Sequence, residues 1–318
     1  MSTDAQNADA TYTELRAQLA TLTTEAFRPE LAEIDQLPTL EIAKIMNGED
    51  ASVPTAVAAQ LPQIAAAIDG TAERMARGGR LIYAGAGTAG RLGVLDASEC
   101  PPTFNTDPGE VVGLIAGGPS AMITAVEGAE DSKELAAEDL DALNLTADDI
   151  VVGISASGRT PYAIGAVEHA RNTRGALTIG LSCNANSALA AAAEHGIEVV
   201  VGPELLTGST RLKAGTAQKL VLNMLSTITM IRLGKTYGNL MVDVRASNEK
   251  LRARSRRIVS LATGADDATI EAALAATDGE VKNAILVVLG EVEGPTAARL
   301  LTESNGHLRA ALAAAATS

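Results

Sequence analysis

The chain has 318 residues, of which 47% are hydrophobic and only 2% are aromatic. This length allows one large domain and a small one, with an interior of Ala, Val, Leu and Ile that suits helices packed on a parallel sheet. The net charge of −14 disfavours nucleic acid and anionic membranes as partners, so any phosphate site needs local compensation.

Cysteine and histidine are sparse and scattered along the chain. Cys100 and Cys183 form no CxxC pair, so we expect no disulfide scaffold. His169, His195 and His307 lie far apart in the sequence and no HExxH motif occurs, so a dedicated zinc site is not expected. We expect no metal and no cofactor. No charged-then-apolar leader opens the chain and no apolar run reaches about 18 residues, so we expect a soluble, cytoplasmic protein.

The predicted elements change character once along the chain. Residues 1–10 are polar, and helical periodicity follows from about residue 11 to residue 77, with breaks near Pro29, Pro38 and Pro54. Short apolar runs then alternate with helical segments, which predicts a parallel sheet in a three-layer, flavodoxin-like αβα fold. Ligand-binding residues are expected just after the strands. The strands are predicted at 80–86, 110–117, 149–156, 176–183 and 197–202.

Helices are predicted again after the sheet. A buried helix is expected over 213–233 and a second over 240–264, followed by three short helical patterns at 266–279, 280–292 and 293–316. Asp266 or Asp267 and Thr296 fit as N-caps or first-turn residues. We therefore expect an N-terminal helical segment (1–55), an α/β domain (56–262) and a small three-helix domain (263–318).

A glycine-rich turn, YAGAGTAGRLG, follows the first predicted strand. Gly85, Gly87 and Gly90 resemble a GxGxxG motif, but the acidic residue that dinucleotide sites place after the second strand is not clear here. We favour a loop whose backbone N–H groups approach a sugar or phosphate, with Thr88 as a hydroxyl donor. A tight turn without a ligand stays an alternative.

The segment GISASGRTPY follows the third predicted strand. It has the composition of an anion-binding nest at a helix N-terminus, although a well-capped helix is the alternative, because Thr160 before Pro161 also fits N-cap and N1. The candidate ligand-binding residues of this segment are Ser155, Ser157, Gly158, Arg159 and Thr160.

The segment GPELLTGSTRLKAGTAQK lies between the last predicted strand and the buried helix. Cations at a helix start are unfavourable unless an anion binds there, which makes the segment a second candidate phosphate site. A solvated helix start is the alternative. Its candidate residues are Glu204, Ser209, Thr210 and Lys213.

Two glutamates are candidate acid–base groups. Pro101 and Pro102 predict that a helix ends near Glu99, where the helix dipole and burial would both favour a protonated carboxyl. Glu130 lies in the acidic run EGAEDSKE, where neighbouring charges could raise one pKa into the range of a base. The alternatives are an ordinary exposed glutamate for the first and a solvated acidic face for the second.

Taken together, these segments resemble one family, the N-acetylmuramic acid 6-phosphate etherases. The resemblance rests on GRLIYAGAGTAGRLGVLDASECPPTF, VVGISASGRTPY, TGSTRLKAGTAQKLVLNMLST and GNLMVDVRASNEKL, and runs from about residue 40 to the C-terminus. It implies an SIS phosphosugar-binding domain and a small helical domain similar to ubiquitin-associated domains. Ala89 departs from the family pattern, since relatives often have serine there.

The resemblance also implies an activity. A carbon–oxygen lyase of this family converts N-acetylmuramic acid 6-phosphate and water into N-acetylglucosamine 6-phosphate and D-lactate, in amino sugar catabolism. Glu99 matches the proposed acid and Glu130 the proposed base. A homodimer is expected, and a phosphosugar isomerase or a non-catalytic sugar-phosphate sensor is the alternative.

Overall fold

A five-stranded parallel sheet forms the centre of the fold in the computed structural model, which describes residue 19, residues 21–244 and residues 249–317. Its strand order, β2-β1-β3-β4-β5, is the flavodoxin-like order, with a topological switch point between β1 and β3. The predicted parallel sheet is therefore confirmed. The strands are β1 (Leu81–Gly85), β2 (Val111–Ile115), β3 (Ile150–Ile154), β4 (Leu177–Ser182) and β5 (His195–Glu198).

The fifth strand lies earlier in the chain than predicted. The apolar run at 197–202 suggested a strand there, but β5 begins at His195 and ends at Glu198. One hydrogen bond to β4 continues beyond β5, because the Val199 N–H donates to the Ser182 carbonyl. The pairing stops there, because β4 itself ends at Ser182. Val199 and Val201 are buried against the main core without continuing the ladder, which explains their hydrophobicity.

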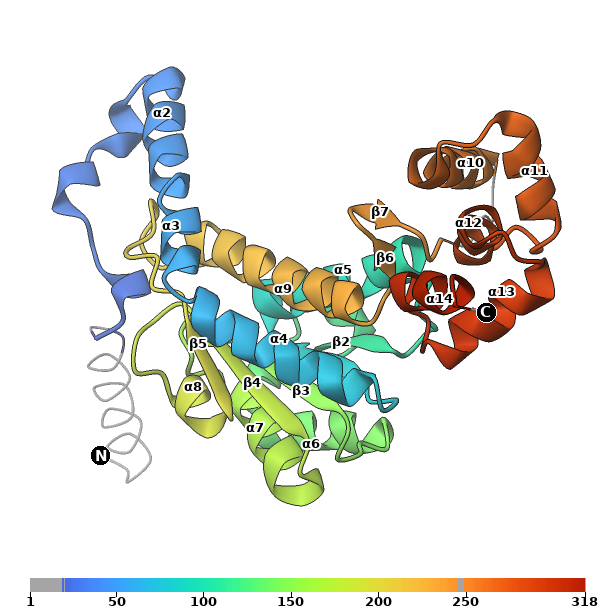
Figure 1. The fold of residues 1–318 in the computed structure, drawn as a ribbon. Helices are drawn as coiled ribbons and strands as arrows, with labels where there is room; N and C mark the ends of the chain where they lie inside the picture. Colours follow the sequence, from blue (N-terminus) through green and yellow to red (C-terminus); the bar gives the residue numbers. More distant parts are fainter. Residues whose placement is uncertain (1–18, 20, 245–248, 318) are drawn as a thin grey trace, which may run out of the picture.

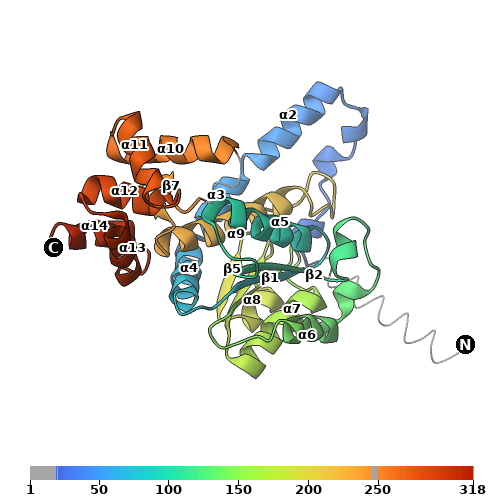
Figure 2. The ribbon, with the colours of Figure 1, turned by 90° about the vertical axis from the view of Figure 1, so that its right-hand side faces the viewer.

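Helices cover both faces of the sheet, as Figures 1 and 2 show. Alternate strand residues point to opposite faces: Tyr83 and Val152 pack into the larger core, whereas Ile82 and Val151 pack into the other. One face carries α3 (Val53–Ala58), α4 (Leu61–Met75), α5 (Gly87–Phe104) and α9 (Lys213–Arg232). The other carries α6 (Lys133–Ala142), α7 (Pro161–His169) and α8 (Ala188–Ala192).

The N-terminal region is less regular than its periodicity predicted. Residues 1–18 and 20 lie outside the described residues. Short 3₁₀ turns at Thr23–Glu25, Pro29–Leu31 and Ile34–Gln36 precede α2 (Thr39–Asp50). Pro29 and Pro38 interrupt the helical pattern as expected. Helix α2 has no buried residue and projects from the body of the molecule (Figure 1).

Helix α5 continues through the two prolines that were expected to end it. Pro101 and Pro102 lie in its last turn, where each removes only one backbone donor. The helix ends at Asn105, whose φ of 52° is left-handed and whose N–H donates to the Pro101 carbonyl. Glu99 is therefore inside the helix and not at its C-terminus.

The C-terminal helices form a separate hydrophobic cluster, which extends from Val242 to Ala311. The predicted helix at 240–264 is only partly correct, because a two-stranded ladder, β6 (Thr236–Tyr237) and β7 (Leu240–Met241), turns at Gly238. The third predicted pattern is two helices, separated near Asn305 and Gly306, which both have positive φ. The helices are α10 (Glu249–Thr263), α11 (Asp267–Ala275), α12 (Val281–Gly290), α13 (Gly294–Glu303) and α14 (Leu308–Ala315).

Two details of this cluster agree with the sequence. The Asp266 carboxylate accepts from the Thr269 N–H and caps α11, and Thr296 lies in the first turn of α13.

The boundaries at 55 and 263 remain predictions. Among the described residues, no single helix could cross a membrane; helices α2–α3 and α4 meet the criteria of length and composition only as a pair bent by 60°.

A buried ion pair joins the starts of β1 and β3. The Asp149 carboxylate, 1% exposed, accepts from Arg80 Nε at 2.9 Å, Arg80 Nη2 at 2.7 Å and the backbone N–H of Arg80 at 2.9 Å. It also accepts from the Thr146 N–H at 2.7 Å. Burial would raise the pKa of Asp149, but these hydrogen bonds outweigh it and hold the pKa below its ordinary value of 3.8.

Replacing this carboxylate should destabilise the fold. We expect Asp149→Asn to lower the free energy of unfolding, measured by urea denaturation, by about 2 to 3 kcal/mol. The reason is that Arg80, which is only partly exposed, loses its ion-pair partner. The lowered pKa means that this contribution is present above about pH 4 and is lost as the pH falls through the folded-state pKa. Asp148→Asn, in an exposed pair with Arg77, should cost less than about 1 kcal/mol. Equal losses for the two variants would contradict this assignment.

Candidate active site

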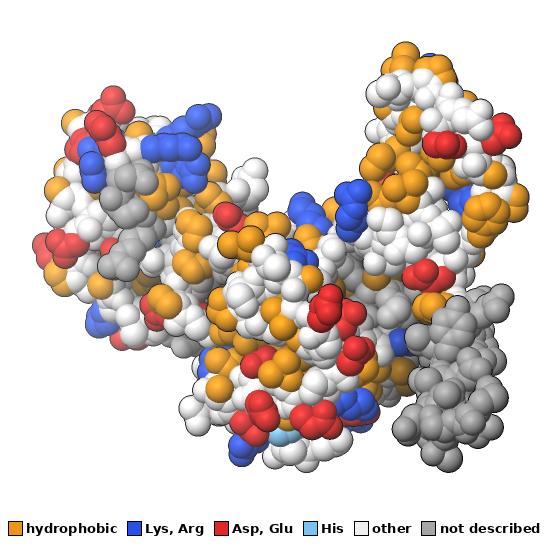
Figure 3. All heavy atoms as spheres, turned by 180° about the vertical axis from the view of Figure 1, so that it is seen from behind, with side chains coloured by type: hydrophobic (Ala, Val, Ile, Leu, Met, Phe, Trp, Pro, Cys, Tyr) orange, Lys and Arg blue, Asp and Glu red, His pale blue; other side chains and the backbone are white. Residues whose placement is uncertain are grey.

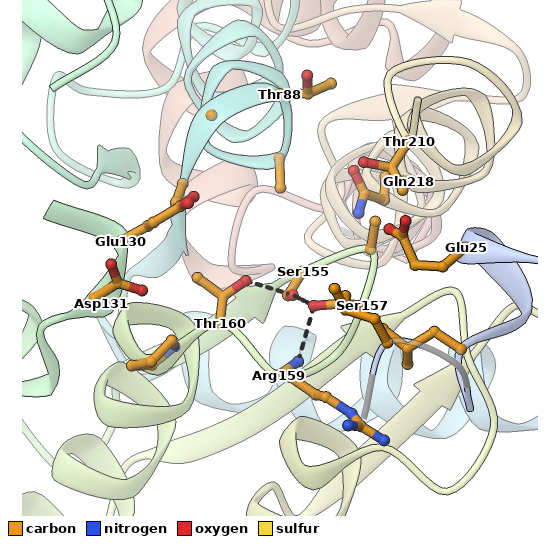
Figure 4. A pocket seen from close by; sticks show the side chains of 17 residues that line it. Glu25, Thr88, Glu130, Asp131, Ser155, Ser157, Arg159, Thr160, Thr210 and Gln218 are labelled. Atoms are coloured by element: carbon orange, nitrogen blue, oxygen red, sulfur yellow. Dashed lines mark hydrogen bonds between the residues drawn. The ribbon is translucent and has the colours of Figure 1, made fainter. Parts of the chain in front are cut away.

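A cavity of about 610 Å³ lies at the carboxyl ends of β1 and β3, the expected ligand position in a doubly wound sheet (Figure 4). Its volume is in the range of small-molecule sites. It is lined by the segments after both strands, by α9 and by the N-terminal segment. The polar lining residues are Glu25, Thr88, Glu130, Asp131, Ser155, Ser157, Arg159, Thr160, Thr210 and Gln218.

Three hydroxyl groups meet on one wall of this cavity, between β3 and α7. Ser155 Oγ lies 2.7 Å from Thr160 Oγ1 and 3.2 Å from Ser157 Oγ, and it accepts from the Gly158 N–H. Thr160 is the N-cap residue of α7 and Pro161 follows at N1, as predicted, but the Thr160 side chain makes no capping hydrogen bond. Capping therefore does not account for the cluster, and all three of its residues line the cavity.

The glycines of the first turn divide into two kinds. A Cβ at Gly90 would lie 2.6 Å from the Gly85 carbonyl oxygen, so these two glycines let α5 pack closely on β1. Gly87 has a φ of 54° and, with Thr88, lines the cavity at the start of α5. The turn thus presents one glycine and one threonine to the cavity, and their contact with a sugar or phosphate stays a prediction.

Glu130 lines the wall formed by the 3₁₀ turn Ala129–Asp131. It is exposed, and it also borders an adjoining cavity of about 180 Å³ that Glu127 lines. The acidic run is therefore not only a solvated face, because two of its carboxylates, Glu130 and Asp131, reach the main cavity.

Glu99 does not share this cavity with Glu130. Gly87 lines the cavity at the start of α5, and Glu99 lies about 18 Å further along the helix axis at 1.5 Å per residue. Its side chain is exposed. Within one chain the structure therefore separates the two candidate acid–base groups, because a helix carries its residues away from the point where it starts.

Two residues predicted to bind the substrate, Glu204 and Lys213, make contacts within the chain, and their role in ligand binding stays a prediction. The buried Glu204 carboxylate accepts from the N–H groups of Lys213 and Ala214, and so caps the start of α9. Lys213 Nζ lies 2.7 Å from a carboxylate oxygen of Glu49 and is only 5% exposed. The Glu49 carboxylate thus compensates this cation within the chain. Ser209 and Gly158 do not line the cavity, whereas Thr210 does.

The sequence reasoning missed two polar residues of the cavity, Glu25 and Gln218. Glu25 comes from a segment whose fold the periodicity did not predict. Gln218 is 1% exposed on α9, a helix that is apolar over much of its circumference, and a glutamine among such residues was the signal that could have identified it. The described lining contains three carboxylates and one guanidinium, that of Arg159. No group of three or more metal-ligating side chains occurs among the described residues.

Comparisons with known proteins define the class of this fold and site. Residues 63–171 match the family profile of the glucokinase regulatory protein N-terminal SIS domain, and residues 131–228 match that of the SIS domain. A phosphoheptose isomerase from Francisella tularensis shares the fold, with a TM-score of 0.50 and 22% identity over 61% of this chain and all of that chain. The α/β domain is thus an SIS domain.

Curated relatives define the family within that class. A protein of Streptomyces avermitilis named N-acetylmuramic acid 6-phosphate etherase is 85% identical over 96% of this chain and 97% of its own length. A Rubrobacter xylanophilus protein of the same name is 61% identical over 93% of this chain and 97% of its own length. The chain belongs to the N-acetylmuramic acid 6-phosphate etherase family.

Proposed function

We propose that this chain cleaves the lactyl ether of N-acetylmuramic acid 6-phosphate with water, giving N-acetylglucosamine 6-phosphate and D-lactate. The observation that carries the proposal is one cavity with a hydroxyl cluster at Ser155, Ser157 and Thr160 on one wall and the Glu130 carboxylate on another. The first group suits a phosphate at a helix N-terminus, and the second suits proton abstraction. The name that the close relatives share supports the same reaction.

The base in this scheme is Glu130. In the open-chain sugar, the lactyl oxygen on carbon 3 is β to the aldehyde, so removal of the carbon 2 proton gives an enolate that expels lactate. Water then adds to carbon 3, and a proton returns to carbon 2. Glu130 comes from a turn next to the start of α6, so its carboxylate can approach a sugar whose phosphate is held by the opposite hydroxyl cluster.

The acid in this scheme is Glu99, supplied by a second copy of the chain. The leaving ether oxygen needs a proton, and Glu99 lies too far along α5 to deliver it to the cavity of its own chain. Leu95, one turn before Glu99, is 50% exposed, which gives this end of α5 an apolar surface beside the carboxylate. An isologous homodimer would complete two such sites at once.

The projecting N-terminal arm also supports a homodimer. Residues 27–50 leave the body of the molecule, and hydrophobic side chains gather along this projection in Figure 3. Phe27 is 65% exposed, Leu37 is 40% exposed and Leu40 is 64% exposed. Large apolar side chains grouped on a projecting segment are typical of a surface that a partner covers.

Both glutamates should be required for turnover. Wild-type protein is expected to release D-lactate from N-acetylmuramic acid 6-phosphate, and Glu130→Gln or Glu99→Gln should each lower kcat by about 10²- to 10⁴-fold, the usual contribution of a positioned acid or base. Because both side chains are exposed, the melting temperatures should stay unchanged. Glu33→Gln, outside the cavity, is the control. Wild-type turnover in the double variant would overturn the assignment, and sugar isomerisation without lactate release would favour an isomerase.

The hydroxyl cluster should set affinity for the phosphate. Ser155→Ala removes the hydroxyl that contacts both Ser157 and Thr160, so we expect about a tenfold to hundredfold higher dissociation constant for N-acetylglucosamine 6-phosphate by calorimetry. Affinity for unphosphorylated N-acetylglucosamine should not change. A loss of affinity that is equal for both sugars would mean that Ser155 does not bind phosphate.

A further inference from the structure

Gln218 has an unsatisfied donor inside the cavity. Its side chain is 1% exposed, and its Nε2 has no hydrogen-bond partner among the described residues. An unpaired buried amide donor costs free energy, so this group calls for a partner that the described residues do not supply. Figure 4 shows the amide at the cavity wall, near Thr210 and Glu25.

Glu25 is held in the same part of the cavity by a hydrogen-bonded clamp at Asn184. Asn184 Oδ1 accepts from the Thr23 N–H at 2.9 Å and from Thr23 Oγ1 at 2.8 Å. Its Nδ2 donates to Thr24 Oγ1 at 3.1 Å and to the Ala156 carbonyl at 3.0 Å. Asn184 is buried at the end of β4, so the clamp fixes the turn that carries Glu25 to the sheet and to the loop of the hydroxyl cluster.

The loop before α9 accommodates the Glu25 carboxylate closely. A Cβ at Gly208 would lie 2.7 Å from Glu25 Oε2, and Gly208 has a φ of 77°. Glu25 supplies an acceptor and Gln218 Nε2 supplies a donor, and both line one cavity. The two groups therefore match a ligand that offers one N–H and one carbonyl oxygen.

We propose that Gln218 and Glu25 form a subsite for the acetamido group on carbon 2 of the sugar. Gln218 Nε2 donates to the acetyl carbonyl oxygen, and the Glu25 carboxylate accepts from the amide N–H. This inference rests on the proposed function, which supplies an N-acetylated sugar phosphate. The lactyl carboxylate is a poorer occupant, because Glu25 would repel it.

The subsite would also orient the reacting carbon. The acetamido nitrogen is bonded to carbon 2, whose proton Glu130 removes. Figure 4 shows Glu130 and the pair Gln218–Glu25 on opposite sides of the hydroxyl cluster. A sugar held by its phosphate and its acetamido group is thereby fixed at two points, which leaves carbon 2 directed toward the base.

The test compares two sugar phosphates that differ at carbon 2. Calorimetry of the full chain should give about tenfold tighter binding of N-acetylglucosamine 6-phosphate than of glucose 6-phosphate, the effect of one or two net hydrogen bonds. Gln218→Met, similar in volume but without a donor, should remove most of this preference and leave the affinity for glucose 6-phosphate unchanged. Glu25→Met should reduce the preference as well. The controls are Gln63→Met and Glu33→Met, both exposed and outside the cavity.

Thermal unfolding separates this role from a structural one. Gln218→Met removes an unpaired buried donor, so the ligand-free variant should melt no lower than the wild type. A lower melting temperature with unchanged preference would mean that Gln218 is structural and would overturn the subsite. Equal binding of both sugar phosphates by a wild-type chain that releases D-lactate would overturn the subsite alone. An N-acetyl preference without lactate release would overturn the proposed function alone.

Discussion

The geometry of the site depends on one buried carboxylate, Asp96. It accepts from Tyr83 Oη at 2.7 Å, Asn223 Nδ2 at 2.6 Å and Ser226 Oγ at 3.2 Å, which ties α5 to both β1 and α9. Burial raises the pKa of Asp96 more than these hydrogen bonds lower it. With α5 fixed in this way, Thr88 lies in the cavity and Glu99 lies outside it.

The position of α5 decides which groups of the proposed site lie in the cavity of one chain and which group must come from a second copy. In one cavity the chain itself brings together the hydroxyl cluster, the Glu130 carboxylate and the pair Gln218–Glu25, to which we assign the phosphate, proton abstraction and the acetamido group. It does not bring Glu99 of α5 to the same cavity. We propose that a second copy supplies this residue, in a dimer that covers the exposed apolar side chains of the N-terminal arm. We assign the local positive compensation that a phosphate needs in this acidic chain to Arg159, which lines the cavity, and to backbone N–H groups at the start of α7.

Much of the fold and part of the site could be predicted from sequence. Strand–helix alternation identified the sheet because buried parallel strands are continuous apolar runs, and the residues after β1 and β3 line the cavity as expected. Composition could not show that Lys213 has a carboxylate partner within the chain, because its contact with Glu49 joins segments far apart in the sequence. Glu25 and Gln218 were missed because their proximity depends on long-range contacts, through Asn184 and through the packing of α9.

The most direct test of the proposed site is complementation between two inactive variants. Chains with Glu99→Gln and chains with Glu130→Gln are mixed, allowed to exchange subunits, and assayed for D-lactate release. If a second copy supplies Glu99, each mixed dimer has one intact site, and random exchange in a two-fold dimer restores about a quarter of wild-type activity. If Glu99 acted within its own chain, no mixed dimer would contain an intact site. Activity that stays at the level of the separate variants would therefore contradict a site shared between two chains.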